Sequence, residues 1–160
     1  MKRGWFITCF LFSLLIDQIS KFLILKKLPY GKPVEVLGEA IRFTFIFNPG
    51  GLFGIGKGMG WFFVLMGVVF FLLIPFFLRG KRSVMEETGF GLILGGATGN
   101  LIDRIRFGAV IDFIDMGYKG FRWPVFNLGD AALSVGIGLV LLAELRRRRD
   151  ASNSLVDRSS

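Results

Sequence analysis

Histidine is absent from the 160-residue sequence, and Cys9 is its only cysteine. A single cysteine excludes a disulfide within the chain, and the lack of histidine excludes a histidine-dependent catalytic triad and the usual zinc ligand sets. We therefore expect no metal and no cofactor. Any chemistry must come from Asp, Asn, Ser, Lys or Arg side chains.

Apolar residues are abundant instead. The chain is 52% hydrophobic and 15% aromatic, with 19 Phe, which is more apolar surface than one small soluble core can bury. This composition predicts a mainly α-helical, polytopic membrane protein. The net charge of +8 does not indicate nucleic-acid binding, because Lys and Arg gather at the ends of apolar runs and not on an aromatic-rich basic face.

Four segments have the length and composition of membrane spans, since a bilayer core of about 30 Å needs about 20 apolar residues per helix. We expect helices at about 4–25, 59–78, 88–106 and 128–145. The third is weak by hydropathy, but Gly91, Gly95 and Gly99 recur at four-residue spacing. Small residues at this spacing let a neighbouring helix approach closely, which favours a buried helix in a bundle.

Basic clusters predict the orientation of the spans. With four spans, residues 2–3, 79–82 and 146–149 lie on one side, which the positive-inside rule makes cytoplasmic. The longer loop on the opposite side holds five basic residues: Lys26, Lys27, Lys32, Arg42 and Lys57. They do not outweigh the short terminal clusters, so both chain ends are expected in the cytoplasm.

The remaining segments complete the predicted organisation. Residues 1–149 form one four-helix domain, with external segments at about 26–58 and 107–127. Within the first, residues 41–47 read IRFTFIF and predict a strand in a small external β-rich segment. Residues 150–160 are polar and predict a disordered cytoplasmic tail.

Polar residues in the spans sit at helical spacing, so each set lies on one helix face and toward the external end. The sets are Asp17 with Lys21, Asn100 with Asp103 and Arg104, and Asn127 with Asp130. We interpret Asp17–Lys21 and Asp103–Arg104 as ion pairs that hold the helices in register. Asn48 and Asn100 either bridge backbone groups or touch substrate.

Two aspartates lack such an explanation. Asp112 and Asp130 have no basic residue within four positions along the chain, so local pairing does not account for them. An ionisable residue in an apolar run is a functional-site hypothesis. Asp115 follows Asp112 by one helical turn and is expected to be a solvated rim residue.

Five sequence blocks resemble a known family. They are DQISK at 17–21, NPGGLFG at 48–54, GGATGNLIDR at 95–104, VIDFID at 110–115 and FNLGD at 126–130. In this order, and along nearly the whole chain, they resemble the lipoprotein signal peptidases, also called signal peptidase II. The departures from the family pattern, at Pro49, Leu52, Gly129 and Ala131, bear on substrate positioning and not on the reaction.

The resemblance implies an aspartic endopeptidase of the bacterial cytoplasmic (inner) membrane, with its active site toward the external, periplasmic side. It would remove the signal peptide from prolipoproteins by cleaving before a cysteine that carries diacylglycerol. Asp112 and Asp130 would be the catalytic dyad. The residues expected to orient the dyad or contact substrate are Asp17, Lys21, Asn48, Gly50, Asn100, Asp103, Arg104 and Asn127.

The expected partners are the diacylglyceryl prolipoprotein, membrane lipid and peptide inhibitors such as globomycin; we expect no nucleic acid, and a monomer. Two neighbouring carboxylates tend to share one proton, so one can act as a base toward water while the other polarises the scissile carbonyl. Aromatic-rich residues 120–126, together with the strand at 41–47, are expected to lie at the membrane interface and steer the peptide.

Three alternatives remain open. A proton or ion carrier needs polar residues through the full depth of the membrane, whereas here they gather at one end. A presenilin-type protease usually has a Gly-x-Gly-Asp block, and NLGD lacks its first glycine. A Ser13–Lys21 peptidase dyad is possible in principle, because residues eight apart share a helix face.

Overall fold

Four helices and a small sheet make up the computed structural model, which describes residues 4–50, 60–77 and 82–156. The helices are α1 (Gly4–Lys27), α2 (Gly60–Phe77), α3 (Val84–Phe107) and α4 (Leu128–Val156). Each overlaps one of the four apolar segments singled out in the sequence, and α4 continues beyond its segment to Val156. In the described part of the chain, Gly4–Lys27 and Leu128–Asn153 are long and apolar enough to cross a membrane.

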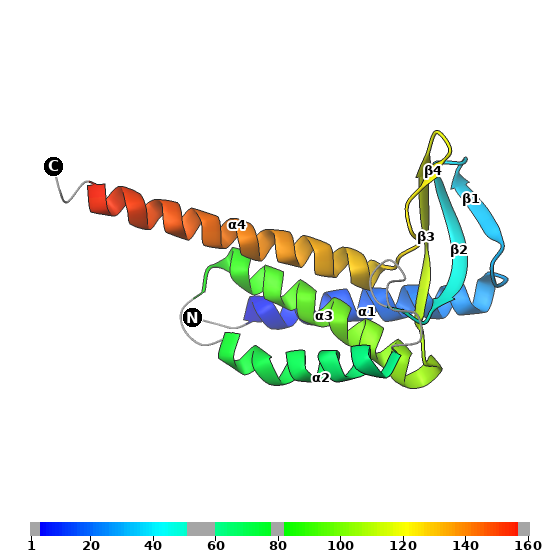
Figure 1. Cartoon of the computed structure of the whole chain (residues 1–160), viewed down its shortest axis with the longest axis horizontal. Coiled ribbons are helices and arrows are strands. Elements are labelled where there is room, and N and C mark those ends of the chain that lie inside the picture. Colours follow the sequence, from blue (N-terminus) through cyan, green and yellow to red (C-terminus); the bar gives the residue numbers. More distant parts are fainter. Residues whose placement is uncertain (1–3, 51–59, 78–81, 157–160) are drawn as a thin grey trace.

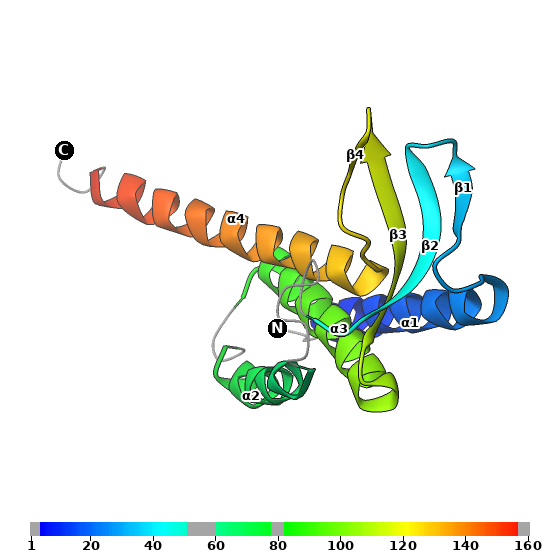
Figure 2. The same ribbon diagram turned by 45° about the vertical axis from the view of Figure 1, so that its right-hand side comes forward.

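Helix α3 packs against α1, α2 and α4 (Figures 1 and 2). Glycines allow this close packing on two sides. A Cβ at Gly91 would lie 2.7 Å from the Phe6 carbonyl oxygen of α1, and one at Gly95 would collide with the Ser13 hydroxyl. A Cβ at Gly89 would lie 2.8 Å from the Gly136 carbonyl oxygen of α4. The glycine spacing in the sequence therefore predicted the close approach of a neighbouring helix correctly.

Both ends of α3 are fixed by local sequence. Ser83 caps its start: the hydroxyl accepts from the Glu86 backbone N–H at 3.2 Å, and the Glu86 carboxylate accepts from the Ser83 N–H at 2.8 Å. Gly108 ends the helix with a left-handed φ of 71°, a conformation that costs glycine little. The turn at Gly108 leads directly into the next strand.

An antiparallel sheet of four strands lies at one end of the bundle, opposite the start of α1 and the end of α4 (Figure 1). The strands, in their order across the sheet, are β1 (Pro33–Leu37), β2 (Ile41–Asn48), β3 (Val110–Tyr118) and β4 (Phe121–Arg122). The predicted strand at 41–47 is confirmed as β2. Buried Ile24, Phe45 and Phe113 join α1 to the sheet in one apolar cluster.

The structure corrects two expectations. Asp112 is the third residue of strand β3, in the external segment 107–127, for which the sequence predicted no strand. The expected disorder of the tail at 150–160 is wrong for 150–156, because α4 continues to Val156. The rest of the tail lies outside the described residues, as do 51–59, which include most of the NPGGLFG block, and 79–81 of the second basic cluster.

Candidate active site

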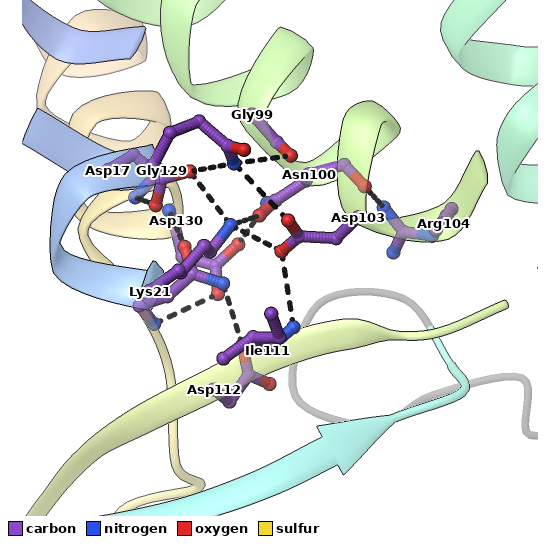
Figure 3. A network of polar contacts seen from close by, with 12 residues as sticks. Asp17, Lys21, Gly99, Asn100, Asp103, Arg104, Ile111, Asp112, Gly129 and Asp130 are labelled. Atoms are coloured by element: carbon purple, nitrogen blue, oxygen red, sulfur yellow. Dashed lines mark hydrogen bonds and ion pairs between the residues drawn. The ribbon is translucent and has the colours of Figure 1, made fainter. Parts of the chain in front are cut away.

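The polar residues predicted from the sequence converge where the helices meet the sheet (Figure 3). They come from α1, α3, the start of α4, strand β3 and the end of β2. Most have almost no solvent-exposed surface; the buried set is Asp17, Lys21, Asn100, Asp103, Asp112 and Asn127. Because buried polar groups are costly without partners, the hydrogen bonds among them decide whether this arrangement is stable.

Lys21 is the centre of the α1 side of the site. Its ammonium lies 2.8 Å from carboxylate oxygens of both Asp17 and Asp103. The predicted Asp17–Lys21 pair is therefore confirmed, whereas the salt-bridge partner of Asp103 is Lys21 on another helix and not its neighbour Arg104. Asp103 also accepts from the Ile111 backbone N–H at 3.2 Å, which ties α3 to β3.

Asn100 connects this cluster to Asp130. Its side-chain oxygen accepts from the Lys21 ammonium at 2.8 Å, and its side-chain nitrogen donates to Asp130 Oδ1 at 2.8 Å (Figure 3). An ammonium is only a donor, so the Asn100 oxygen must face Lys21 and the amide N–H must face Asp130. The orientation of this amide therefore follows from its partners.

Asn127 is the cap of α4 and joins the two aspartates. Its side-chain oxygen accepts from the Asp130 backbone N–H at 2.8 Å, as expected of an N-cap asparagine. This leaves its side-chain nitrogen to donate to Asp112 Oδ1 at 2.6 Å. One capping residue thus places Asp130 in the first turn of α4 and contacts the carboxylate of Asp112.

Asp112 receives a second amide from the end of β2. Asn48 donates to Asp112 Oδ2 at 2.8 Å, while its own side-chain oxygen accepts from the Gly50 backbone N–H at 2.9 Å. Arg104 holds the same turn by donating to the Gly50 carbonyl oxygen at 2.9 Å. The backbone donor again fixes which end of the Asn48 amide faces the carboxylate.

Burial and the neighbouring negative charge of Asp130 together raise the pKa of Asp112 from 3.8 to about 7, with burial the larger cause. The hydrogen bonds from Asn48 and Asn127 oppose this rise because they favour the charged form. Near neutral pH, Asp112 can therefore hold a proton beside an aspartate of the same site. Two neighbouring carboxyl groups with one proton between them can serve as an acid and a base at once.

Asp115 is a further correction. We expected a solvated rim residue, but it is 7% exposed. Its carboxylate accepts from Arg122 of β4 at 2.7 Å and from the Thr44 hydroxyl of β2 at 2.8 Å. Asp115 therefore links three strands beside Asp112. Sequence reasoning missed Thr44 and Arg122 because they meet Asp115 only through strand pairing.

Gln18 was also missed. Its side-chain nitrogen lies within 3.3 Å of oxygens of Asp17 and Asp103 and of the Gly99 carbonyl. Its place in the DQISK block was the only available signal. The Ser13–Lys21 interpretation is not supported by the observed contacts: Ser13 donates to the Phe10 carbonyl oxygen at 3.1 Å, and Lys21 donates to its carboxylates and to Asn100.

Comparison with solved structures first gives the class of protein. Two bacterial membrane enzyme structures, obtained by the in meso method at 2.3 and 1.9 Å resolution, share this fold. The first has a TM-score of 0.83 and 32% sequence identity, covering 94% of this chain and 91% of its own. The second has a TM-score of 0.79 and 31% identity, covering 89% and 93%.

Comparison of sequences then gives the family. The model of signal peptidase (SPase) II matches residues 9–146. A lipoprotein signal peptidase of Polynucleobacter necessarius is 40% identical over 84% of this chain and 85% of its own length. That of Halothermothrix orenii is 40% identical over 82% and 89%. The chain belongs to the signal peptidase II family, membrane aspartic proteases that cleave signal peptides from prolipoproteins.

Proposed function

We propose that Asp112 and Asp130 are the catalytic dyad and that the substrate is a prolipoprotein whose cysteine carries diacylglycerol, cleaved just before that cysteine. One observation carries the proposal: Asn127 contacts the carboxylate of Asp112 and the backbone N–H of Asp130, so a buried aspartate of a strand and a partly buried aspartate of a helix share one site. Family membership supports the same residues through the VIDFID and FNLGD blocks.

The proposed reaction needs one proton shared by the dyad. Asp130 accepts a proton from water as the water oxygen attacks the scissile carbonyl carbon. Asp112 donates its proton to the carbonyl oxygen, which gives a neutral gem-diol. When the C–N bond breaks, the nitrogen of the lipidated cysteine takes the proton from Asp130 and the diol returns a proton to Asp112. The dyad then holds one proton again.

The other polar residues support the dyad in this proposal. Asn48, Asn100 and Asn127 donate hydrogen bonds to its carboxylates. Asp17, Lys21 and Asp103 form the buried cluster behind Asn100, while Arg104 holds the turn at Gly50. Peptide inhibitors of the globomycin type would bind in the same place as the substrate peptide, to a monomeric enzyme.

For the membrane, we propose four spans in the bacterial inner membrane, with both chain ends in the cytoplasm and the dyad at the external side. The basic cluster at 146–149 and the position of the sheet at the opposite end of the bundle support this orientation (Figure 1). In this arrangement the acyl chains of the substrate stay in lipid while its scissile bond reaches water and the dyad.

Cleavage by purified protein in detergent tests the function. We expect cleavage of a diacylglyceryl-modified prolipoprotein, but not of the unmodified precursor, and loss of this activity in both Asp112→Asn and Asp130→Asn. Asn153→Leu, an exposed change near the end of α4, is the control and should cleave like wild type. Equal cleavage of both precursors would refute the substrate class, and an active variant at either aspartate would refute the dyad.

The carrier interpretation predicts a different outcome. A carrier would cleave neither precursor but would change the pH or ion content of vesicles. Of the residues in the first nine positions of α1, none is buried and polar, whereas Ser13, Asp17 and Lys21 further along are. Polar burial that begins only midway along α1 offers no relay through the membrane, so cleavage is the expected result.

A further inference from the structure

Lys21 uses its whole hydrogen-bonding capacity inside the protein. Its side chain is 2% exposed, and its three possible donors match three oxygens at 2.8 Å, on Asp17, Asp103 and Asn100. Two of these partners are carboxylates, which suffice to hold an ammonium in place. The third is the amide that contacts Asp130, so Lys21 is linked to the dyad by a single intervening side chain.

The charged groups around Asp130 come from three elements. Helix α1 contributes Lys21 and Asp17, α3 contributes Asp103 and Arg104, and β3 contributes Asp112. The two cations are placed differently. Lys21 acts on Asp130 through the Asn100 side chain, whereas Arg104 donates to carbonyl oxygens of Asn100, at 3.3 Å, and Gly50. Within the described structure, the amide facing Asp130 is thus oriented by a positive charge.

The amides at Asp112 are oriented differently. The Asn48 and Asn127 side-chain oxygens accept from the neutral backbone N–H groups of Gly50 and Asp130, whereas the Asn100 oxygen accepts from an ammonium. A charge-assisted donor polarises an amide more strongly than a neutral one, and bonds in a chain strengthen one another. The amide N–H of Asn100 should therefore favour a negative carboxylate more than those of Asn48 and Asn127 do.

From this arrangement we infer that Lys21, acting through Asn100, is a positioning residue that keeps Asp130 the ionised member of the dyad and leaves the shared proton on Asp112. The inference rests on the proposed function, because it assigns the base and the acid within that dyad. It also gives the buried Lys21 a role beyond joining two helices.

The inference predicts how activity depends on pH. The active dyad holds one proton, so activity falls at low pH when Asp130 becomes protonated. Removing the charge or the amide that favours ionised Asp130 must move this acid limb to higher pH. An opposite charge within a few ångströms shifts the pKa of a carboxyl group by about 1 unit or more. This magnitude sets the expected displacement of the acid limb.

The experiment compares the acid limb of kcat/KM for the lipidated substrate in three variants. Lys21→Met removes the charge and should raise the midpoint by about 1 pH unit or more. Asn100→Leu removes only the link and keeps the ion pairs of Lys21 with Asp17 and Asp103; it should raise the midpoint by about 1 unit. Thr98→Val is the control, since it loses the hydrogen bond from Thr98 to the Leu94 carbonyl oxygen within α3, and no hydrogen bond of the described structure joins the Thr98 side chain to Asn100 or Asp130.

The control should keep the wild-type midpoint even if its melting temperature falls. Lys21→Met leaves two buried carboxylates without their cation, so Asn100→Leu is the deciding variant if Lys21→Met does not fold. A wild-type acid limb in folded Asn100→Leu would overturn the inference while leaving the dyad intact. Retained activity in Asp130→Asn would instead overturn the proposed function, so the two failures are distinguishable.

Discussion

Asp130 and Asp112 are held by two different kinds of structure. Asp130 sits in the first turn of a helix, and its amide donor, Asn100, comes from a helix that glycines bring close to its neighbours. Asp112 lies on a strand and receives its donors from the end of β2 and from the α4 cap. Helix packing therefore orients one carboxylate, whereas strand pairing and a turn orient the other.

The largest loss of activity is expected from a change at Asn127, which contacts both aspartates. Asn127→Leu removes a donor to Asp112 and the cap on the Asp130 backbone N–H, so both carboxylates lose their placement together. Two hydrogen bonds of this kind are worth about 3 kcal/mol in total, which predicts a fall in kcat of about 100-fold. Steady-state cleavage of the lipidated substrate measures it, with Asn153→Leu as the matched control. A fall of less than about threefold would show that the two sides do not depend on Asn127.

Raising the pH is expected to reduce activity by removing the proton from Asp112. Its pKa of about 7 lies above the ordinary value, so the protonated form is favoured below pH 7 and lost above it. Activity should then decline about tenfold per pH unit as the dyad loses its shared proton. A pH profile of kcat/KM on the lipidated substrate measures this decline. Constant activity from pH 6 to pH 9, on the order of three units of range, would contradict a proton on Asp112.

Asn48→Leu should move the basic limb of the pH profile, whereas Asn100→Leu should move the acid limb. Asn48 donates to Asp112 and so favours its charged form; without it the basic limb should move up by about 1 pH unit, while the acid limb stays in place. Loss of one oriented donor should also lower kcat about tenfold. The measurement is the same pH profile. A shift of the acid limb instead would remove the distinction between the two sides.

The smallest effect is expected at the rim of the sheet. Trp123 follows β4 and is 49% exposed, and we expect it to steer the peptide at the membrane interface. Trp123→Ala should raise KM about threefold with kcat unchanged, since it would remove binding that is equal in the ground and transition states. Trp5→Ala, an exposed tryptophan at the other end of the bundle, is the control. Unchanged turnover of lipidated substrate in Trp123→Ala at all concentrations would count against this role.

The helical side of the site was largely predictable from the sequence. Helical spacing placed Asp17 beside Lys21, and the glycines of α3 predicted a close neighbour. The partner of Asp103 was not predictable in the same way, because Lys21 lies on another helix, 82 positions away in the chain. Spacing reports contacts within a helix but not which helices meet.

The sheet side was less predictable for a physical reason. The run Val110–Phe113 is buried at every position, so it shows no alternation between polar and apolar residues that would mark a strand. The burial of Asp115 depends on pairing with β2 and on a hairpin that returns Arg122 to it. These contacts follow from strand register, which the sequence pattern alone does not determine.

The most direct test of the account is the location of the shared proton. Infrared spectra of protein with isotope-labelled aspartate can follow the carbonyl band of a protonated carboxyl group as pH is raised. We predict that wild type loses one such band with a midpoint of about 7, the pKa of Asp112, and that Asp112→Asn lacks this titrating band. A titrating band that survives in Asp112→Asn and disappears in Asp130→Asn would place the proton on the other aspartate and contradict the account.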